Sequence, residues 1–198
     1  MAVSAVSVIQ FTPVTPTTTS RVRNAWTCVT DTARRAALAA AVTSVAVGTA
    51  MPAPWSVRAA TAFVGVLLVI AALVDLHERR IPNRLLAFAA VVTLAGSVPN
   101  PDAHHLLLVG LGALTGGGAM LTVHLCRGVG MGDVKMAAVV GASCGWLSFE
   151  AAPIAVAVAA FAASLYGVWS RRSSLALGPS LWFGWAISIA ASSAGWWT

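Results

Sequence analysis

Charged residues are scarce in this sequence. Only 9% of its 198 residues are Asp, Glu, Lys or Arg, whereas 58% are hydrophobic. A soluble domain carries about 25% charged residues, so this chain lacks the charge to cover a water-exposed surface. The lipid bilayer is the solvent that suits such a composition. We therefore predict an all-α, polytopic membrane helix bundle.

Cysteine is also rare, with three residues that form no Cys-x-x-Cys pair: Cys28, Cys126 and Cys144. This spacing argues against a zinc site and against a disulfide framework. We expect small buried cysteines, with no metal and no cofactor bound. The net charge of +6 comes from short basic clusters between apolar runs. Such clusters are typical of the flanks of membrane helices, so we expect no nucleic-acid partner.

The apolar residues fall into runs that predict about seven transmembrane helices, with six also possible. The runs are roughly 36–51, 57–74, 84–99, 105–125, 134–149, 153–169 and 179–197. Residues 1–33 include a stretch rich in Thr, Ser and Pro and are expected to form a flexible cytoplasmic N-terminal tail. Residues 34–198 then form one membrane-embedded domain.

Lysine and arginine orient these helices. With the N-terminus in the cytoplasm, Arg58 alone of the 12 Lys and Arg residues lies on the outer side. This asymmetry is a strong positive-inside signal. If the first run did not cross the membrane, the four N-terminal arginines would move outside and most of the asymmetry would be lost. The topology with seven helices is therefore favoured.

Acidic residues are the scarcest charged class, with only six in the chain. In the favoured topology, Asp75 and Asp133 are the two that adjoin apolar helices on the cytoplasmic side. Asp75 follows the second apolar run and Asp133 opens the fifth. Ionisable groups at membrane depth are unfavourable, so they are functional candidates by default. Either residue alone is explained equally well as an interfacial charge, but the pair indicates a shared site.

Two carboxylates that approach each other share a proton, because both cannot ionise easily. Such a pair can hydrolyse a peptide. The ionised carboxylate takes a proton from water while the protonated one hydrogen-bonds the carbonyl oxygen. Asp133 lies near the positive N-terminus of its helix, so we expect it to be the ionised partner and Asp75 to be the protonated one.

Glycines precede the second aspartate. Gly130 and Gly132 are expected to adopt positive φ and to let an extended substrate reach Asp133. Lys135 follows on the same helix, and interfacial anchoring is its favoured role, with a catalytic role as the alternative. After the first aspartate, Pro82 ends one helix and Asn83 is expected to cap the next.

Three blocks of sequence resemble those of the type IV prepilin peptidases, which are membrane aspartic proteases of the GxGD class. Gly130-Met131-Gly132-Asp133-Val134-Lys135 resembles their G-x-G-D-x-K motif. Asp75 with the Arg80-Ile81-Pro82-Asn83 segment is similar to their other aspartate block, and Gly178-Pro179 is similar to a C-terminal G-P block. The chain resembles the short forms that lack the N-terminal zinc-binding and methyltransferase domain, including those that serve tight-adherence pili, and the resemblance leaves N-methylation of the product open.

The resemblance implies an aspartic endopeptidase of the bacterial inner membrane. It would cleave the leader from type IV prepilin-like or pseudopilin precursors at the cytoplasmic face, just before the hydrophobic N-terminal helix of the precursor. Its partners are then the precursor and the lipid bilayer, and the oligomeric state is left open. Asp75 and Asp133 would be catalytic. The residues expected to form the motifs or admit the substrate are Gly130, Gly132, Lys135, Pro82, Asn83, Gly178 and Pro179.

Two other functions fit the same pattern. A small transporter or relay for protons or cations also uses intramembrane acids, although it would place Asp75 and Asp133 in the middle of their helices. A catalytically inactive pilus-assembly membrane protein would keep the helices and lose the chemistry.

Overall fold

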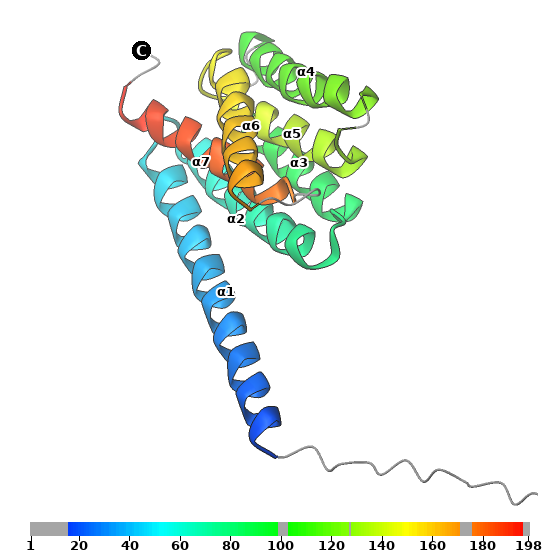
Figure 1. Cartoon of the computed structure of the whole chain (residues 1–198). Coiled ribbons are helices and arrows are strands. Elements are labelled where there is room, and N and C mark those ends of the chain that lie inside the picture. Colours follow the sequence, from blue (N-terminus) through cyan, green and yellow to red (C-terminus); the bar gives the residue numbers. More distant parts are fainter. Residues whose placement is uncertain (1–15, 99–102, 127, 171–175, 196–198) are drawn as a thin grey trace, which may run out of the picture. The chain divides into compact units, whose positions relative to one another are not determined.

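The computed structural model describes residues 16–98, 103–126, 128–170 and 176–195, with side chains described from residue 32 onward. All the regular secondary structure among these residues is helical, and short turns and loops connect the helices. The chain is therefore the all-α helical membrane bundle that the composition predicts (Figure 1). The helices are α1 (Pro16–Ala50), α2 (Trp55–Glu78), α3 (Asn83–Ser97), α4 (Ala103–Leu125), α5 (Met131–Cys144), α6 (Ala151–Ser170) and α7 (Gly178–Ser193). Helices α2 to α7 follow the expected apolar runs closely.

Helix α1 begins at Pro16, well before the first apolar run. No proline or glycine interrupts residues 17–47, so helical structure continues through the polar residues that precede the run. Pro16 suits the first turn because its missing N–H would have no helical partner there. Residues 1–15 of the expected tail lie outside the described residues. By contacts the chain divides into two units, Met1–Ala36 and Ala37–Thr198, and the boundary at residue 33 stays a prediction.

Three of the described helices, α2, α4 and α6, are long and apolar enough to cross a membrane. Helix α3 is a shorter apolar helix of 15 residues. Large apolar side chains remain exposed on these elements, including Leu114, Phe161 and Trp169. Such exposure is unfavourable in water and suits contact with lipid.

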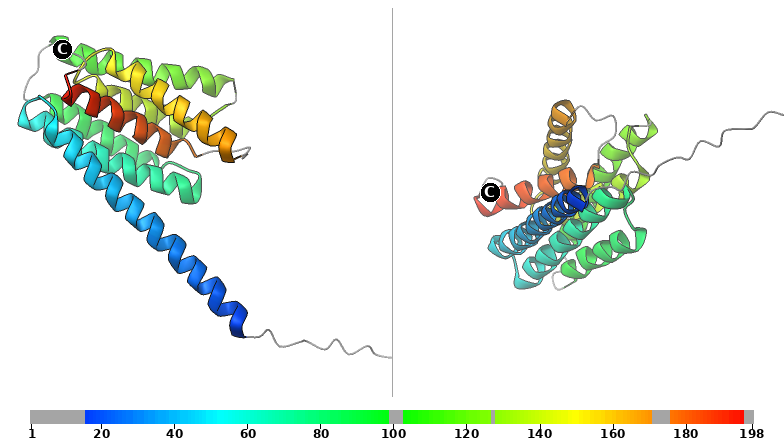
Figure 2. Two further views of the ribbon diagram at one scale, coloured as in Figure 1. Left: turned by 60° about the vertical axis from the view of Figure 1, so that its left-hand side comes forward. Right: turned by 60° about the horizontal axis from the view of Figure 1, so that its bottom comes forward.

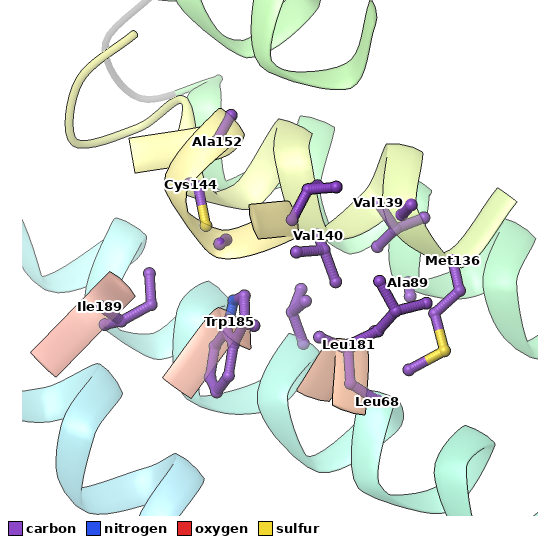
Figure 3. Close-up of a cluster of buried hydrophobic side chains, with 14 of the residues drawn as sticks. Leu68, Ala89, Met136, Val139, Val140, Cys144, Ala152, Leu181, Trp185 and Ile189 are labelled. Atoms are coloured by element: carbon purple, nitrogen blue, oxygen red, sulfur yellow. The ribbon is translucent and has the colours of Figure 1, made fainter. Parts of the chain in front are cut away.

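Helix α5 is the centre of the second unit. It packs against α2, α3, α4, α6 and α7. A helix with neighbours on so many sides must carry small or compact side chains, and the buried residues of α5 include Ala137, Val140, Gly141 and Cys144. Figure 3 shows α5 side chains meeting residues of α2, α3, α6 and α7 in one apolar cluster. The position of α5 also fixes the residues at its N-terminus, including Asp133.

Backbones of α4 and α5 come into direct contact through glycine. A Cβ atom added to Gly116 would collide with the carbonyl oxygen of Ala137. A Cβ atom added to Gly141 would likewise collide with the carbonyl oxygen of Gly112. Small residues allow this approach between membrane helices, where van der Waals packing replaces the hydrophobic effect.

Helix α7 is held against the bundle by indole hydrogen bonds. Trp185 Nε1–H donates to Ser143 Oγ of α5 at 3.0 Å, and Trp182 Nε1–H donates to Ser44 Oγ at 2.9 Å. The Trp185 side chain is fully buried, so its N–H needs this partner. These bonds fix the N-terminal end of α7, where Gly178 lies.

The α4–α5 contact gives a stability prediction. We expect Gly116→Val to lower the free energy of unfolding in detergent by about 1–3 kcal/mol, because the new side chain must push α5 away. Gly118→Val is the matched control on the same helix, since a Cβ atom there meets nothing within 4 Å. It should change the free energy by no more than about 0.5 kcal/mol. Equal effects of the two variants would show that α4 and α5 do not pack through Gly116.

Candidate active site

A cavity of about 340 Å³ lies where α2 ends and where α3 and α5 begin. Both candidate aspartates line it, together with three basic side chains. The lining residues are Asp75, Arg79, Arg80, Ile81, Asn83, Gly130, Met131, Gly132, Asp133 and Lys135. The structure therefore brings together two segments that lie more than 40 residues apart in the sequence.

Asp75 lies in the last turn of α2 and is only 7% exposed. Its Oδ2 atom accepts a hydrogen bond of 2.9 Å from the backbone N–H of Gly178, the first residue of α7. A Cβ atom added to Gly178 would lie 3.0 Å from Asp75 Oδ2 and 3.1 Å from Ala72 Cα. Glycine is needed for this close approach, and Pro179 follows in the first turn, where its missing N–H does no harm. This contact explains the G-P block.

The chain turns sharply after Asp75. Arg79 adopts the left-handed conformation, with φ 52° and ψ 35°, and its N–H donates to the carbonyl oxygen of Asp75 at 2.9 Å. Arg79 is the one described residue other than glycine with a positive φ. This cap position usually holds glycine or asparagine, so an arginine here does not indicate a left-handed turn. After this turn, Arg79 and Arg80 line the cavity.

Asp133 lies in the first turn of α5. The Asp133 side chain reaches back to the residue before the helix. Its Oδ2 atom accepts a hydrogen bond of 3.2 Å from the N–H of Gly130. Its Oδ1 atom is buried and has no hydrogen-bond partner among the described residues. A buried oxygen of this kind is normally satisfied by a polar partner, and here it is the atom available to a substrate or a water molecule.

The glycines before Asp133 serve close approach rather than unusual backbone angles. Gly130 has φ −76°, and Gly195 is the one described glycine with a positive φ, so the expectation of positive φ at Gly130 and Gly132 was wrong. A Cβ atom added to Gly132 would lie 3.2 Å from Ile81 Cβ. The glycine lets the start of α5 pack tightly against the loop that follows Asp75, which keeps the two aspartates in one cavity.

The loop before Gly130 is held by the end of α4. His124 Nδ1–H donates to the carbonyl oxygen of Val129 at 2.7 Å, and the N–H of Gly128 donates to the carbonyl oxygen of Val123 at 3.0 Å. Sequence reasoning gave His124 no role here. Its partner is a backbone atom that no sequence motif identifies.

The protonation of Asp133 differs from what the helix end predicts. Burial, followed by the negative charge of Asp75, raises the pKa of Asp133 from its ordinary value of 3.8 to about 6. The hydrogen bond from Gly130 N–H acts in the opposite direction and is the weakest of the three effects. Loss of water and a neighbouring carboxylate thus outweigh the helix N-terminus. The raised pKa makes Asp133 the candidate proton donor, in place of the ionised role that its helix end predicts.

Lys135 of α5 and Asn83 of α3 both line the cavity and bind each other. Lys135 Nζ donates to Asn83 Oδ1 at 2.9 Å. The residue before α3 is Pro82, and no side-chain cap bond is formed there, so the expected capping role of Asn83 was wrong. The side chain of Asn83 instead links α3 to α5. Lys135 faces the cavity, and an interfacial anchoring role alone does not account for this bond.

Most of the predicted site residues lie at the cavity or in contact with it. Six of them line it: Asp75, Asn83, Gly130, Gly132, Asp133 and Lys135. Gly178 contacts Asp75, while Pro82 and Pro179 shape the starts of α3 and α7. Within the described residues, no group of three or more His, Cys, Asp or Glu side chains is arranged to hold a metal.

A model of the type IV leader peptidase family matches residues 62–168, just over half of the chain. The chain belongs to this family. In this leader peptidase family member, the matched residues include both aspartates and all the residues that line the cavity. The match ends before α7. No curated protein and no solved structure matches the chain.

Coupling between the aspartates can be measured directly. In detergent or nanodiscs, carbon-13 NMR of carboxyl-labelled aspartate should show Asp133 titrating near pH 6, with Asp133→Asn used to assign the signal. Asp75→Asn removes a negative charge, so the pKa of Asp133 should fall. An unchanged titration in Asp75→Asn would show that the two side chains are not electrostatic neighbours.

The Lys135–Asn83 bond gives a second prediction for this site. We expect Lys135→Ala and Asn83→Ala each to slow precursor cleavage by about tenfold, because either change removes the hydrogen bond that links α3 to α5 at the cavity. The double variant should be no slower than the singles, since both remove the same bond. Arg84→Ala is the control, as Arg84 is exposed and does not line the cavity. Full activity of Asn83→Ala would assign Lys135 to anchoring alone.

Proposed function

We propose that the protein is an aspartic endopeptidase that removes the leader from type IV prepilin-like or pseudopilin precursors. The observation that carries the proposal is the shared cavity, in which burial and then the charge of Asp75 raise the pKa of Asp133. Two carboxyl groups that share one proton are the arrangement that aspartic proteases use, and a raised pKa at one of the two is the mark of such a pair. Membership of the leader peptidase family supports the choice of substrate.

The first step is the attack of water on the scissile carbonyl. Asp75 receives a hydrogen bond from Gly178 N–H at the positive end of α7, an environment that suits a carboxylate. It therefore serves as the base that takes a proton from water. Asp133, whose pKa is raised above that of an ordinary aspartate, donates a proton to the carbonyl oxygen, which gives a tetrahedral diol. These roles are the reverse of those that the helix ends predict.

The second step breaks the C–N bond of the diol. Asp75 now carries the proton taken from water and passes it to the leaving nitrogen. Asp133 recovers its proton from the diol hydroxyl as the new carboxyl group forms. Both side chains then return to their starting states, and the reaction balances with one water consumed.

The position of the aspartates favours a protease over a proton or cation relay. Asp75 is in the last turn of α2 and Asp133 is in the first turn of α5. A relay across the membrane needs acids along the length of the helices, whereas a protease that cuts just outside an apolar helix needs them at helix ends. The positive-inside distribution supports a site at the cytoplasmic face of the inner membrane.

Cleavage of a purified prepilin-like precursor in lipid vesicles tests this function. We expect the wild-type protein to remove the leader, and Asp75→Asn and Asp133→Asn each to lower the rate by at least about 10⁴-fold. Because the pair acts as a unit, the double variant should be no slower than either single variant. Glu78→Gln is the control, since Glu78 is exposed, close in sequence and outside the cavity lining. Retained cleavage in either Asn variant would rule out the mechanism.

A further inference from the structure

A second cavity of about 390 Å³ opens as a groove between α3 and α4, with α5 as its floor. Its walls are apolar and mostly small. They include Ala90 and Leu94 of α3, Leu106 and Gly110 of α4, and Ala138 and Ala142 of α5. The hydroxyl of the lining residue Thr93 already donates to the Ala89 carbonyl oxygen of its own helix, so it offers no donor to a polar ligand. The groove therefore suits an apolar occupant.

The groove has the form of a seat for one helix. Helices α3 and α4 both pack on α5, and they are not among the helix pairs that pack closely on each other in the described structure. Figure 1 shows them on opposite sides of α5, and the left view of Figure 2 shows α4 along the edge of the bundle. At Gly110 an added Cβ atom would meet nothing within 4 Å. Small residues of this kind let membrane helices approach closely.

Two helices connect the groove with the candidate active site. Helix α3 begins at Asn83 and α5 carries Asp133 in its first turn, and both residues line the catalytic cavity. The groove lining begins further along the same helices, at Ala90 and Ala138. At 1.5 Å of rise per residue, the groove starts roughly 7–8 Å from Asp133 along α5 and roughly 10–11 Å from Asn83 along α3. Two or three extended residues span that distance at about 3.3 Å each.

We propose that this groove binds the apolar N-terminal helix of the precursor, an inference that rests on the proposed function. The cleaved bond then lies two or three residues before the first seated residue, within reach of Asp133. The leader precedes the apolar helix in the precursor, so the bound helix runs parallel to α5, with its N-terminus at the catalytic end. The precursor is then recognised as a helix bound in an apolar groove. The small side chains of α5 at the bottom of the groove, Ala138 and Ala142, set how closely the bound helix can approach.

Filling the groove tests the proposal. Gly110→Leu places a side chain in the open space of the groove, and Gly118→Leu is its matched control on α4, also in open space but outside the groove lining. We expect Gly110→Leu to raise KM for the precursor by about tenfold or more, which corresponds to the loss of one well-packed contact. Gly118→Leu should behave as wild type. Thermal unfolding of both variants establishes that each is folded. Equal KM values for the two variants would overturn the proposal.

Photo-cross-linking provides a test that does not need catalysis. A photoreactive residue replaces Leu106 at the groove or, as control, the exposed Leu165 of α6, both in the Asp133→Asn background with precursor in vesicles. Cross-links to the precursor helix from position 106 and not from position 165 would support docking. Cross-links to lipid alone would overturn it. If the wild type fails to cleave and position 106 still captures the precursor, the proposed protease function fails while the docking groove stands.

Discussion

A carboxylate at the end of a membrane helix loses much of its water and is stable only where hydrogen-bond donors replace that water. This protein meets the requirement twice with backbone N–H groups at helix starts. Gly178 N–H donates to Asp75, and Gly130 N–H donates to Asp133. Asp133 keeps one buried oxygen without a partner among the described residues. Backbone N–H groups thus stabilise the site, and one carboxyl oxygen of Asp133 stays available for chemistry.

The packing of α5 holds Asp133 in the position where this hydrogen bond can form. Asp133 has a defined place because α5 is enclosed by five other helices, and α5 fits there because it is built from small residues such as Ala137 and Gly141. Gly178, at the start of α7, lies beside Asp75 because the hydrogen bond from Trp185 to Ser143 holds α7 against α5. The same helix α5 then forms the floor of the apolar groove. One central helix in this way connects the core, the candidate active site and the proposed seat for the substrate.

Sequence patterns predict the helical class, most helix boundaries and the two aspartates, because hydropathy and scarce charge act locally along the chain. They do not show which aspartate holds the proton, since burial and the charge of Asp75 outweigh the local helix end at Asp133. They also miss the bond between Asp75 and Gly178, which spans 103 positions, and the left-handed Arg79. The angles of the glycines and the role of Asn83 were mispredicted for the same reason, because tertiary neighbours decide both.

The shared action of the two carboxyl groups is best tested with an analogue of the diol intermediate. A precursor peptide whose scissile amide is replaced by a hydroxyl-bearing carbon should place that hydroxyl between Asp75 and Asp133. Its affinity for the wild-type protein should exceed that of the same peptide without the hydroxyl by about 100-fold or more. Both Asp75→Asn and Asp133→Asn should abolish this difference. Equal affinities of the two peptides for the wild type would mean that the aspartates do not act together on a tetrahedral intermediate.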